Sequence, residues 1–296
     1  MRFFSYQALT LGAALVVSSM ATARAATMKV SPASPQPGDV VSIVIYPSAG
    51  EKIDGVGMTA WDTKDVPFYR RNDGTVRAFA GFPFNRKGGK QTLRARVQVS
   101  KNGNVVEQVV STSIAARDRH YPTQRISMNS STASTMNRTD LLRREKLHVQ
   151  SKMKSSTAAP LWNGSWIVPS KGRASSAYGR RRYVNGKWWG QHNGTDIKAS
   201  TGTPIYATNA GRVVLSEYLP NLRGNCVVID HGCNIFSLYL HMSRRDVRVG
   251  QSVARAQRIG AVGATGFVTG PHLHWEMRVG WEPVDPYQFV RRGVQF

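Results

Sequence analysis

Acidic residues are scarce in this sequence of 296 residues, in which 17 Asp and Glu side chains stand against 40 Lys and Arg side chains. The formal net charge is therefore +23 at pH 7. A field of that sign attracts polyanions, and the attraction weakens as salt is added. The composition thus indicates an anionic polymer as a partner.

Long apolar runs are missing after the first 25 residues, so we expect no membrane-spanning segment in the rest of the chain. The first residues combine a cationic start at Arg2, an apolar run from about Ala8 to Val17 and the small-residue end Ala23-Arg24-Ala25. This order is typical of a secretory signal peptide cleaved after Ala25, and an uncleaved membrane anchor is the alternative. We predict a signal peptide over residues 1–25 and no stable membrane insertion after its cleavage.

Secretion also bears on which polyanion the basic chain meets. Nucleic acid is the usual partner of so basic a protein, but a signal peptide argues against nucleic acid and for an anionic polymer of the cell envelope, such as teichoic acid or lipopolysaccharide. We expect the mature protein to be secreted, periplasmic or associated with the cell wall.

Cysteine is limited to Cys226 and Cys233. In an oxidising compartment an even pair indicates a disulfide. However, we expect Cys233 at a turn and Cys226 well down the preceding strand, so the Cα separation of roughly 4.4 to 6.8 Å that a bridge needs would require a bulge. The sequence leaves the disulfide open.

Helical periodicity is nearly absent, and we predict a mostly β fold. Residues 26–116 alternate apolar and polar side chains, most clearly over residues 93–99, where the tight turn at Asn102-Gly103 follows. Several short strands with such turns predict an N-terminal immunoglobulin-like β-sandwich. In residues 161–296, short strand candidates are linked by Gly and Asn turns, which predicts a C-terminal antiparallel β domain.

Residues 117–160 differ from both flanking regions because Ser, Thr, Met and nine Lys or Arg dominate, with three acidic residues. This composition predicts a basic flexible linker. A short helix is possible within it, with Thr139 as N-cap and with Leu141, Leu142 and Leu147 forming an apolar stripe.

Histidines occur in three separate stretches of the C-terminal region. His272 and His274 flank Leu273 in a predicted strand, so both imidazoles share one face. His192 and Asp196 are four residues apart, and His241 ends a strand-like run. His192, Asp196 and one of the two strand histidines could hold a tetrahedral zinc whose fourth position is left for water, which is the pattern of a catalytic site. For the strand pair alone, solvated side chains on a half-exposed strand are the alternative.

The order of these motifs resembles a known family. His-x-x-x-Asp at residues 192–196, Leu-Tyr-x-His at 238–241 and Gly-Pro-His-x-His-Trp-Glu at 270–276 follow one another in the chain. This set resembles the lysostaphin and LytM-type peptidoglycan metallopeptidases of the M23 group, and the resemblance covers about residues 164–290.

The resemblance implies a division of roles among five residues. His192, Asp196 and His274 would bind one Zn²⁺ per chain, and His241 and His272 would serve catalysis. It also implies an antiparallel metallopeptidase sheet with an open groove along which a peptide lies. The implied activity is hydrolysis of peptide bonds in peptidoglycan stem peptides or cross-links. Since all five positions are filled, the sequence favours the enzyme over inactive relatives.

Other residues near these motifs are expected to support the site or the fold. The motif His-Glu-x-x-His is absent, so Glu276 is not the catalytic glutamate of that protease class. By alternation Glu276 shares the histidine face and could orient a metal ligand. His231 lies in a predicted turn and is expected to be structural.

A different function stays open at this point. The chain could be a non-catalytic or latent wall-binding regulator of other murein hydrolases, with a zinc site that is structural or permanently covered. In the latent form, the linker over residues 117–160 or the segment 178–189 would cover the metal site.

Overall fold

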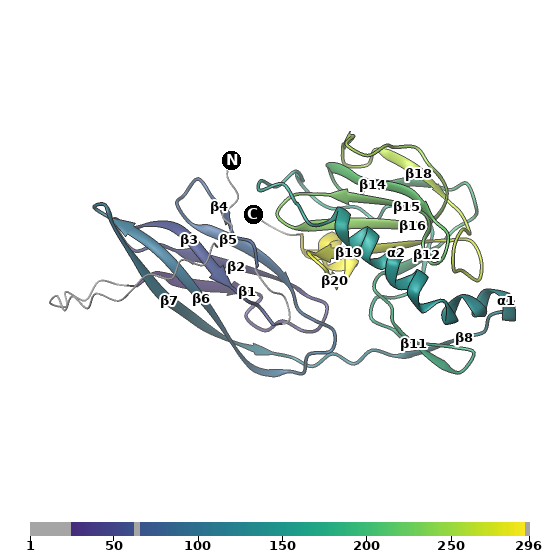
Figure 1. Cartoon of the computed structure of the whole chain (residues 1–296), viewed down its shortest axis with the longest axis horizontal. Coiled ribbons are helices and arrows are strands. Elements are labelled where there is room, and N and C mark those ends of the chain that lie inside the picture. Colours follow the sequence, from purple (N-terminus) through teal and green to yellow (C-terminus); the bar gives the residue numbers. More distant parts are fainter. Residues whose placement is uncertain (1–24, 62–65, 294–296) are drawn as a thin grey trace.

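The computed structural model describes residues 25–61 and 66–293. Figure 1 shows two β assemblies side by side, an N-terminal one at the left and a C-terminal one at the right, with a long helix in front of the latter. Residues 1–24 of the predicted signal peptide lie outside the described residues. Within the described part of the chain, no helix has the length and apolar character needed to cross a bilayer.

The N-terminal assembly consists of two antiparallel sheets with a shared core. Its strands are β1 (Thr27–Ser31), β2 (Val40–Tyr46), β3 (Lys52–Met58), β4 (Tyr69–Arg70), β5 (Val76–Gly81), β6 (Gly89–Lys101) and β7 (Asn104–Ala116). One sheet has the order β1-β2-β5-β4 and the other β3-β6-β7. Alternate residues of β6, such as Leu93 and Val97, are buried against β2 residues such as Ile43. The predicted β-sandwich character is therefore present, while its assignment as immunoglobulin-like and its boundaries stay predictions.

The C-terminal assembly is organised around a ten-stranded sheet. Its strands pair antiparallel, in agreement with the predicted C-terminal antiparallel β domain. Its elements are β9 (Arg173–Ser176), β10 (Arg181–Val184), β11 (Lys187–Gln191), β12 (Thr195–Lys198), β13 (Pro204–Tyr206), β14 (Gly211–Leu219), β15 (Gly224–Asp230), β16 (Ile235–Arg245), β17 (Ser252–Val253), β18 (Arg258–Val262), β19 (His272–Val279), β20 (Glu282–Val284) and α3 (Pro286–Arg292). The main order is β17-β14-β15-β16-β19-β12-β9, with β10 and β11 in a separate small sheet. The open groove implied by the family resemblance stays a prediction.

Much of the segment between the two assemblies forms regular structure, which corrects the expectation of a flexible linker, while the possible helix near Thr139 is present. It forms β8 (Thr123–Ile126), α1 (Ser130–Ala133), the 3₁₀ turn η1 (Ser134–Asn137) and the 14-residue helix α2 (Thr139–Lys152). Strand β8 pairs in parallel with β10. The N-cap of α2 is Arg138, without a side-chain cap bond, so the prediction of Thr139 as N-cap was wrong.

The buried side of α2 also differs from the predicted leucine stripe. Leu141 and Leu147 are 41% and 48% exposed, whereas Glu145 and Val149 are buried. Val149 packs with Leu238 and Leu240 of β16 in one apolar cluster. The Ser, Thr, Met and basic residues of this segment suggested a tether. The buried side chains of Glu145 and Val149 instead mark the side of the helix that meets the sheet.

The large sheet has two distinct faces. In the β16–β19 pair, Leu240 lies opposite His274 and Leu238 opposite Glu276, so these four side chains share one face. The other face of β19 carries Leu273, Trp275 and Met277, which belong to the main core. Helix α2 packs on the first face, and the histidines of β19 therefore lie on the same side of the sheet as α2.

Cys226 and Cys233 are both buried and both free, which answers the question left open by the sequence. Cys226 lies in the apolar cluster under α2, whereas Cys233 lies in the main core. The two thiols thus belong to different clusters, and each packs as a small apolar side chain.

Candidate metal centre

Two neighbouring strands bring the predicted metal ligands together. Asp196 in β12 lies directly opposite His274 in β19, and His192 lies on the loop that enters β12. Gly194 permits this approach, because a Cβ at that position would lie 2.3 Å from the carbonyl oxygen of Trp275. The close packing of the loop on β19 therefore places an imidazole from outside the sheet beside the strand pair.

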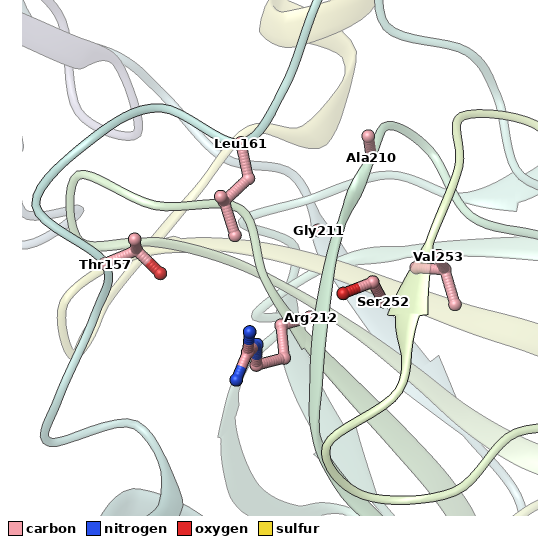
Figure 2. A pocket seen from close by; sticks show the side chains of 7 residues that line it. All are labelled: Thr157, Leu161, Ala210, Gly211, Arg212, Ser252 and Val253. Carbon is pink, nitrogen blue, oxygen red and sulfur yellow. The ribbon is translucent and has the colours of Figure 1, made fainter.

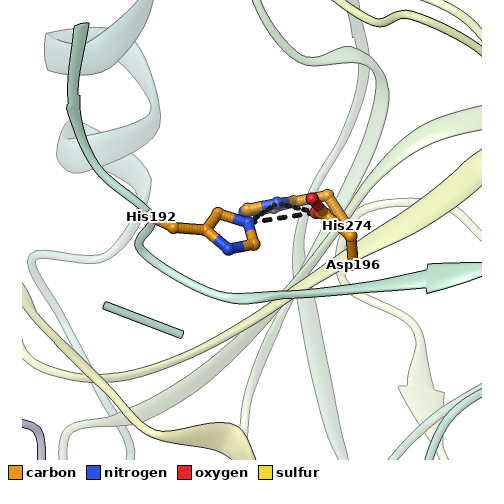
Figure 3. A group of neighbouring side chains, drawn as sticks. All are labelled: His192, Asp196 and His274. Atoms are coloured by element: carbon orange, nitrogen blue, oxygen red, sulfur yellow. Dashed lines mark hydrogen bonds and ion pairs between the residues drawn. The ribbon is translucent and has the colours of Figure 1, made fainter. Parts of the chain in front are cut away.

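Figure 3 shows the side chains of His192, Asp196 and His274 converging on one point. The Nε2 atom of His192 lies 3.0 Å from Asp196 Oδ1 and 3.0 Å from His274 Nδ1. His274 Nδ1 lies 2.8 Å from the same carboxylate oxygen. Tetrahedral ligands at about 2.0–2.1 Å from zinc are separated by about 3.3 Å, so this triangle has nearly the size of one face of a zinc site.

The outer nitrogen of each imidazole fixes the tautomer, and this explains what the triangle can bind. His192 Nδ1 lies 2.8 Å from the carbonyl oxygen of Ala177, so Nδ1–H donates and Nε2 carries a lone pair. His274 Nε2 lies 3.0 Å from Glu276 Oε1, so Nε2–H donates and Nδ1 carries a lone pair. Three acceptor atoms then meet with no donor among them. Such a cluster fits a cation, and the Asp and His donor set suits Zn²⁺.

Further polar side chains hold these ligands in place. Glu276 also accepts hydrogen bonds from Arg278, at 2.7 Å from Nε. The second carboxylate oxygen of Asp196 accepts a hydrogen bond from Arg182, whose Nε–H donates to Gln124 Oε1 at 3.1 Å. The contact of Glu276 with His274 agrees with the alternation of the strand, whereas Arg182 and Gln124 had no signal in the sequence, since each reaches the site through strand pairing.

The charge states of His192 and Asp196 suit metal ligands, whereas the pKa of His274 is raised because Asp196 and Glu276 outweigh the lowering by burial. Burial lowers the pKa of His192 to about 4, so this imidazole is neutral near pH 7. Burial alone would raise the pKa of Asp196, but His192 and His274 outweigh it and hold this pKa well below its usual value. The site therefore presents a neutral imidazole beside an ionised carboxylate.

The other two predicted histidines lie beside this triangle. The ring centroids of His241 and His272 are 5.0 Å apart, and those of His241 and His274 are 5.9 Å apart. His241 Nδ1 lies 2.9 Å from the carbonyl oxygen of Thr265, and His272 Nδ1 lies 2.8 Å from that of Gly270. Both Nδ1–H groups are thus engaged, and each Nε2 is left as an acceptor.

The backbone of His241 is unusual in this setting. Its φ angle is 63°, in the left-handed region that non-glycine residues rarely adopt. Its N–H donates to the carbonyl oxygen of Arg223 at 2.9 Å. Burial, followed by the nearby His272 and His274, lowers the pKa of His241 well below its usual value. His241 is therefore held neutral in a conformation that the surrounding structure imposes.

Three further polar side chains of the C-terminal assembly, Tyr178, Tyr239 and His231, have partners outside the metal centre. The hydroxyl of Tyr178 donates to the carbonyl oxygen of Pro283 at 2.8 Å, and that of Tyr239 accepts from the backbone N–H of Thr208 at 2.8 Å, on the core side of the sheet. Neither hydroxyl supplies a donor at the histidines. His231 is fully buried and contacts Ser237 Oγ at 2.7 Å, in agreement with its structural interpretation.

A small hollow of about 220 Å³ lies elsewhere on the sheet, beside β14 and β17 (Figure 2). Its lining residues are Thr157, Leu161, Ala210, Gly211, Arg212, Ser252 and Val253. None of the five predicted site residues lines it. The hollow therefore has no part in the metal centre.

Comparison with known proteins agrees with this geometry. The family model described as Peptidase family M23 matches residues 190–286, which contain all five of these histidine and aspartate positions. The chain belongs to peptidase family M23. A crystal structure from Pseudomonas aeruginosa assigned to peptidase M23 covers 88% of this M23 chain and is itself covered to 96%, with 26% identity and a TM-score of 0.59.

Several curated relatives of this M23 chain carry the names of peptidoglycan enzymes. Peptidoglycan DD-endopeptidase ShyA of Vibrio cholerae is 47% identical over 119 residues, which is 40% of this chain and 27% of ShyA. DD-carboxypeptidase/endopeptidase Mpg of Neisseria meningitidis is 39% identical over 114 residues, which is 38% of this chain and 26% of Mpg. The chain thus spans about a quarter of the length of these relatives.

Proposed function

We propose that this chain is a zinc metalloendopeptidase that hydrolyses peptide bonds in peptidoglycan stem peptides or cross-links. The observation that carries the proposal is the convergence of three lone-pair atoms, from His192, Asp196 and His274, with no hydrogen-bond donor among them. Membership of family M23 supports the chemistry. The names of ShyA and Mpg support peptidoglycan as the substrate.

One Zn²⁺ per chain would be held by these three residues, with Glu276 and Arg182 orienting two of them. Bound there, the ion would act as a Lewis acid on the peptide carbonyl and lower the pKa of water towards about 7. The other requirements of hydrolysis fall to groups of the chain itself.

His241 and His272 would move the protons of the reaction. Each presents an unprotonated Nε2, because its Nδ1–H donates to a backbone carbonyl group. As water adds to the carbonyl carbon and the C–N bond breaks, one Nε2 accepts a proton from the water and returns it to the leaving amine. The other histidine would first take up a proton from solvent at its Nε2 and would then donate it as a hydrogen bond to the negative oxygen of the tetrahedral intermediate.

The proposed place of action is the cell envelope. Peptidoglycan lies there, and the charge of +23 favours adsorption to anionic envelope polymers. The alternative of a latent or non-catalytic regulator is less well supported, because the relatives carry enzyme names and all five positions are filled.

The test uses the chain from Ala26 onward, with its bound metal quantified and purified peptidoglycan as substrate. We expect close to one zinc per chain and newly formed amino groups that disappear when a chelator is present and return when zinc is restored. Zinc without release of amino groups would contradict the endopeptidase and favour the regulator. Release that persists in chelator would contradict the metal mechanism.

A further inference from the structure

A second, larger hollow lies next to the metal centre and has no role in the proposal above. It encloses about 500 Å³ between α2, Trp189 of β11 with Asn193 of the following loop, and the end of β19. That volume is typical of a ligand site. Asn193 directly follows the metal ligand His192. On the other side, Arg278 lines the hollow and is linked through Glu276 to His274.

The lining of this hollow is cationic. Arg143, Lys146, Arg223 and Arg278 line it, and no Asp or Glu does. Arg223 and Arg278 are balanced by ion pairs with carboxylates behind them, at 3.0 and 2.7 Å. Among the described residues, Arg143 and Lys146 have no ion pair, and both are exposed. The hollow therefore has two uncompensated positive charges at its wall.

Arg223 adds a second observation that points to a missing partner. This side chain is 6% exposed, and among the described residues its Nε–H has no hydrogen-bond acceptor. A buried donor without an acceptor costs free energy, so an anionic group in the hollow would be favoured there.

The remaining walls are apolar and aromatic. Trp189 and Trp281 line the hollow together with Leu142 and Leu222. Trp189 packs against Phe267 with ring centroids 5.0 Å apart, which holds one wall in place. Indole surfaces beside guanidinium groups suit a peptide that carries a carboxylate and some apolar surface, more than they suit a fully hydrated polymer.

We propose that this hollow binds a carboxylate-bearing part of the peptide substrate, with Arg143 and Lys146 as its cationic contacts. Helix α2 would then form a wall of the substrate site instead of a cover over it. The proposal rests on the proposed function, since it assigns the part of the substrate that lies beside the scissile bond.

The test compares two variants with the same loss of charge on the same helix. Arg143→Gln with Lys146→Gln removes the two charges at the hollow, and Arg144→Gln with Lys152→Gln removes two exposed charges of α2 that do not line it. The substrates are purified peptidoglycan and the same material with its carboxylates converted to neutral amides by a carbodiimide.

We expect the first variant to lose about tenfold in kcat/KM on untreated peptidoglycan, mostly through KM, with unchanged zinc content. On the amidated substrate it should equal the unmodified chain, which itself loses activity there. The control variant should follow the unmodified chain on both substrates. Equal losses in both variants, or a loss that persists on the amidated substrate, would overturn the proposal, as would a gain of activity, which would mean that α2 shields the site.

A binding measurement separates this proposal from the proposed function. Soluble disaccharide-peptide fragments of peptidoglycan are titrated into the zinc-loaded chain by calorimetry. If the unmodified chain hydrolyses nothing, the proposed function fails, yet binding that weakens about tenfold only in the Arg143 and Lys146 variant would still support the hollow as a carboxylate site. Unchanged binding in that variant would refute it.

Discussion

Glu145 and Arg223 form a buried ion pair, with 3.0 Å between Oε1 and Nη1, although 78 residues separate them in the chain. The same carboxylate accepts hydrogen bonds from the backbone N–H groups of Asn221, Leu222 and Arg223, at 3.0 to 3.1 Å. The carbonyl oxygen of Arg223 in turn accepts from the N–H of His241. Helix α2 thereby supports the backbone of a proposed catalytic histidine.

Glu145→Ala should destabilise the chain by about 3–5 kcal/mol, because a buried guanidinium group and three backbone donors lose their acceptor. Glu145→Gln should cost less, since its amide oxygen still accepts. Urea unfolding at fixed zinc measures both. Glu107→Ala, which removes an exposed partner of Arg96, is the control and should change stability by less than about 1 kcal/mol. Equal losses at both sites would show that the buried network is unimportant.

His274→Ala should abolish zinc retention, because it removes one of three ligand atoms. His241→Ala should keep zinc and lose about 10²- to 10⁴-fold in turnover, since only proton transfer is affected. Metal analysis after gel filtration and an assay of released amino groups distinguish the two. Full activity in His241→Ala would show that the roles are assigned wrongly.

Glu276→Gln should weaken zinc binding by about 10- to 100-fold, because the acceptor that orients His274 loses its charge. Competition with a chelator of known affinity measures the change. Glu282→Gln on the neighbouring strand β20 is the control and should leave the affinity unchanged. Identical affinities for the Glu276 variant and the unmodified chain would mean that the contact does not tune the metal centre.

Because of His231, the free energy of unfolding should decrease as the pH is lowered. Burial lowers its pKa from 6.5 to about 4 in the folded chain, so between these values the unfolded chain binds more protons. Its contribution is complete above about pH 6.5 and is lost as the pH falls towards 4, by up to about 3 kcal/mol. In metal-free protein, His231→Gln should therefore show a shallower pH dependence over this window than the unmodified chain. The exposed His120→Gln should retain the full slope, and a retained slope in both would contradict the prediction.

The sequence was sufficient to predict those features that depend on residues close together in the chain. Alternation over residues 93–99 predicted the buried face of β6, and the spacing of His272 and His274 predicted their shared face. Family resemblance named the residues that converge, and alternation also placed Glu276 beside His274. Each of these inferences depends on side-chain direction within one strand or on one ordered set of motifs.

The sequence did not predict those contacts whose two partners are far apart in the chain. Burial of Glu145 depends on a turn 76 to 78 residues away, so α2 was mistaken for part of a tether with an apolar leucine stripe. Arg182 reaches Asp196 only because β10 is held by β11 and, in parallel, by β8. The positions of Cys226 and Cys233 in separate clusters likewise follow from packing, which residue spacing along one hairpin does not contain.

Asp196 of β12 lies directly opposite His274 of β19. The metal centre can therefore form only when these two strands pair in this register. A shift of one residue between these strands would turn one of the two side chains to the opposite face and separate the carboxylate from the imidazole. A chain with misaligned strands would then lack the triangle altogether. Tight zinc uptake would consequently report that β12 and β19 have paired in the correct register.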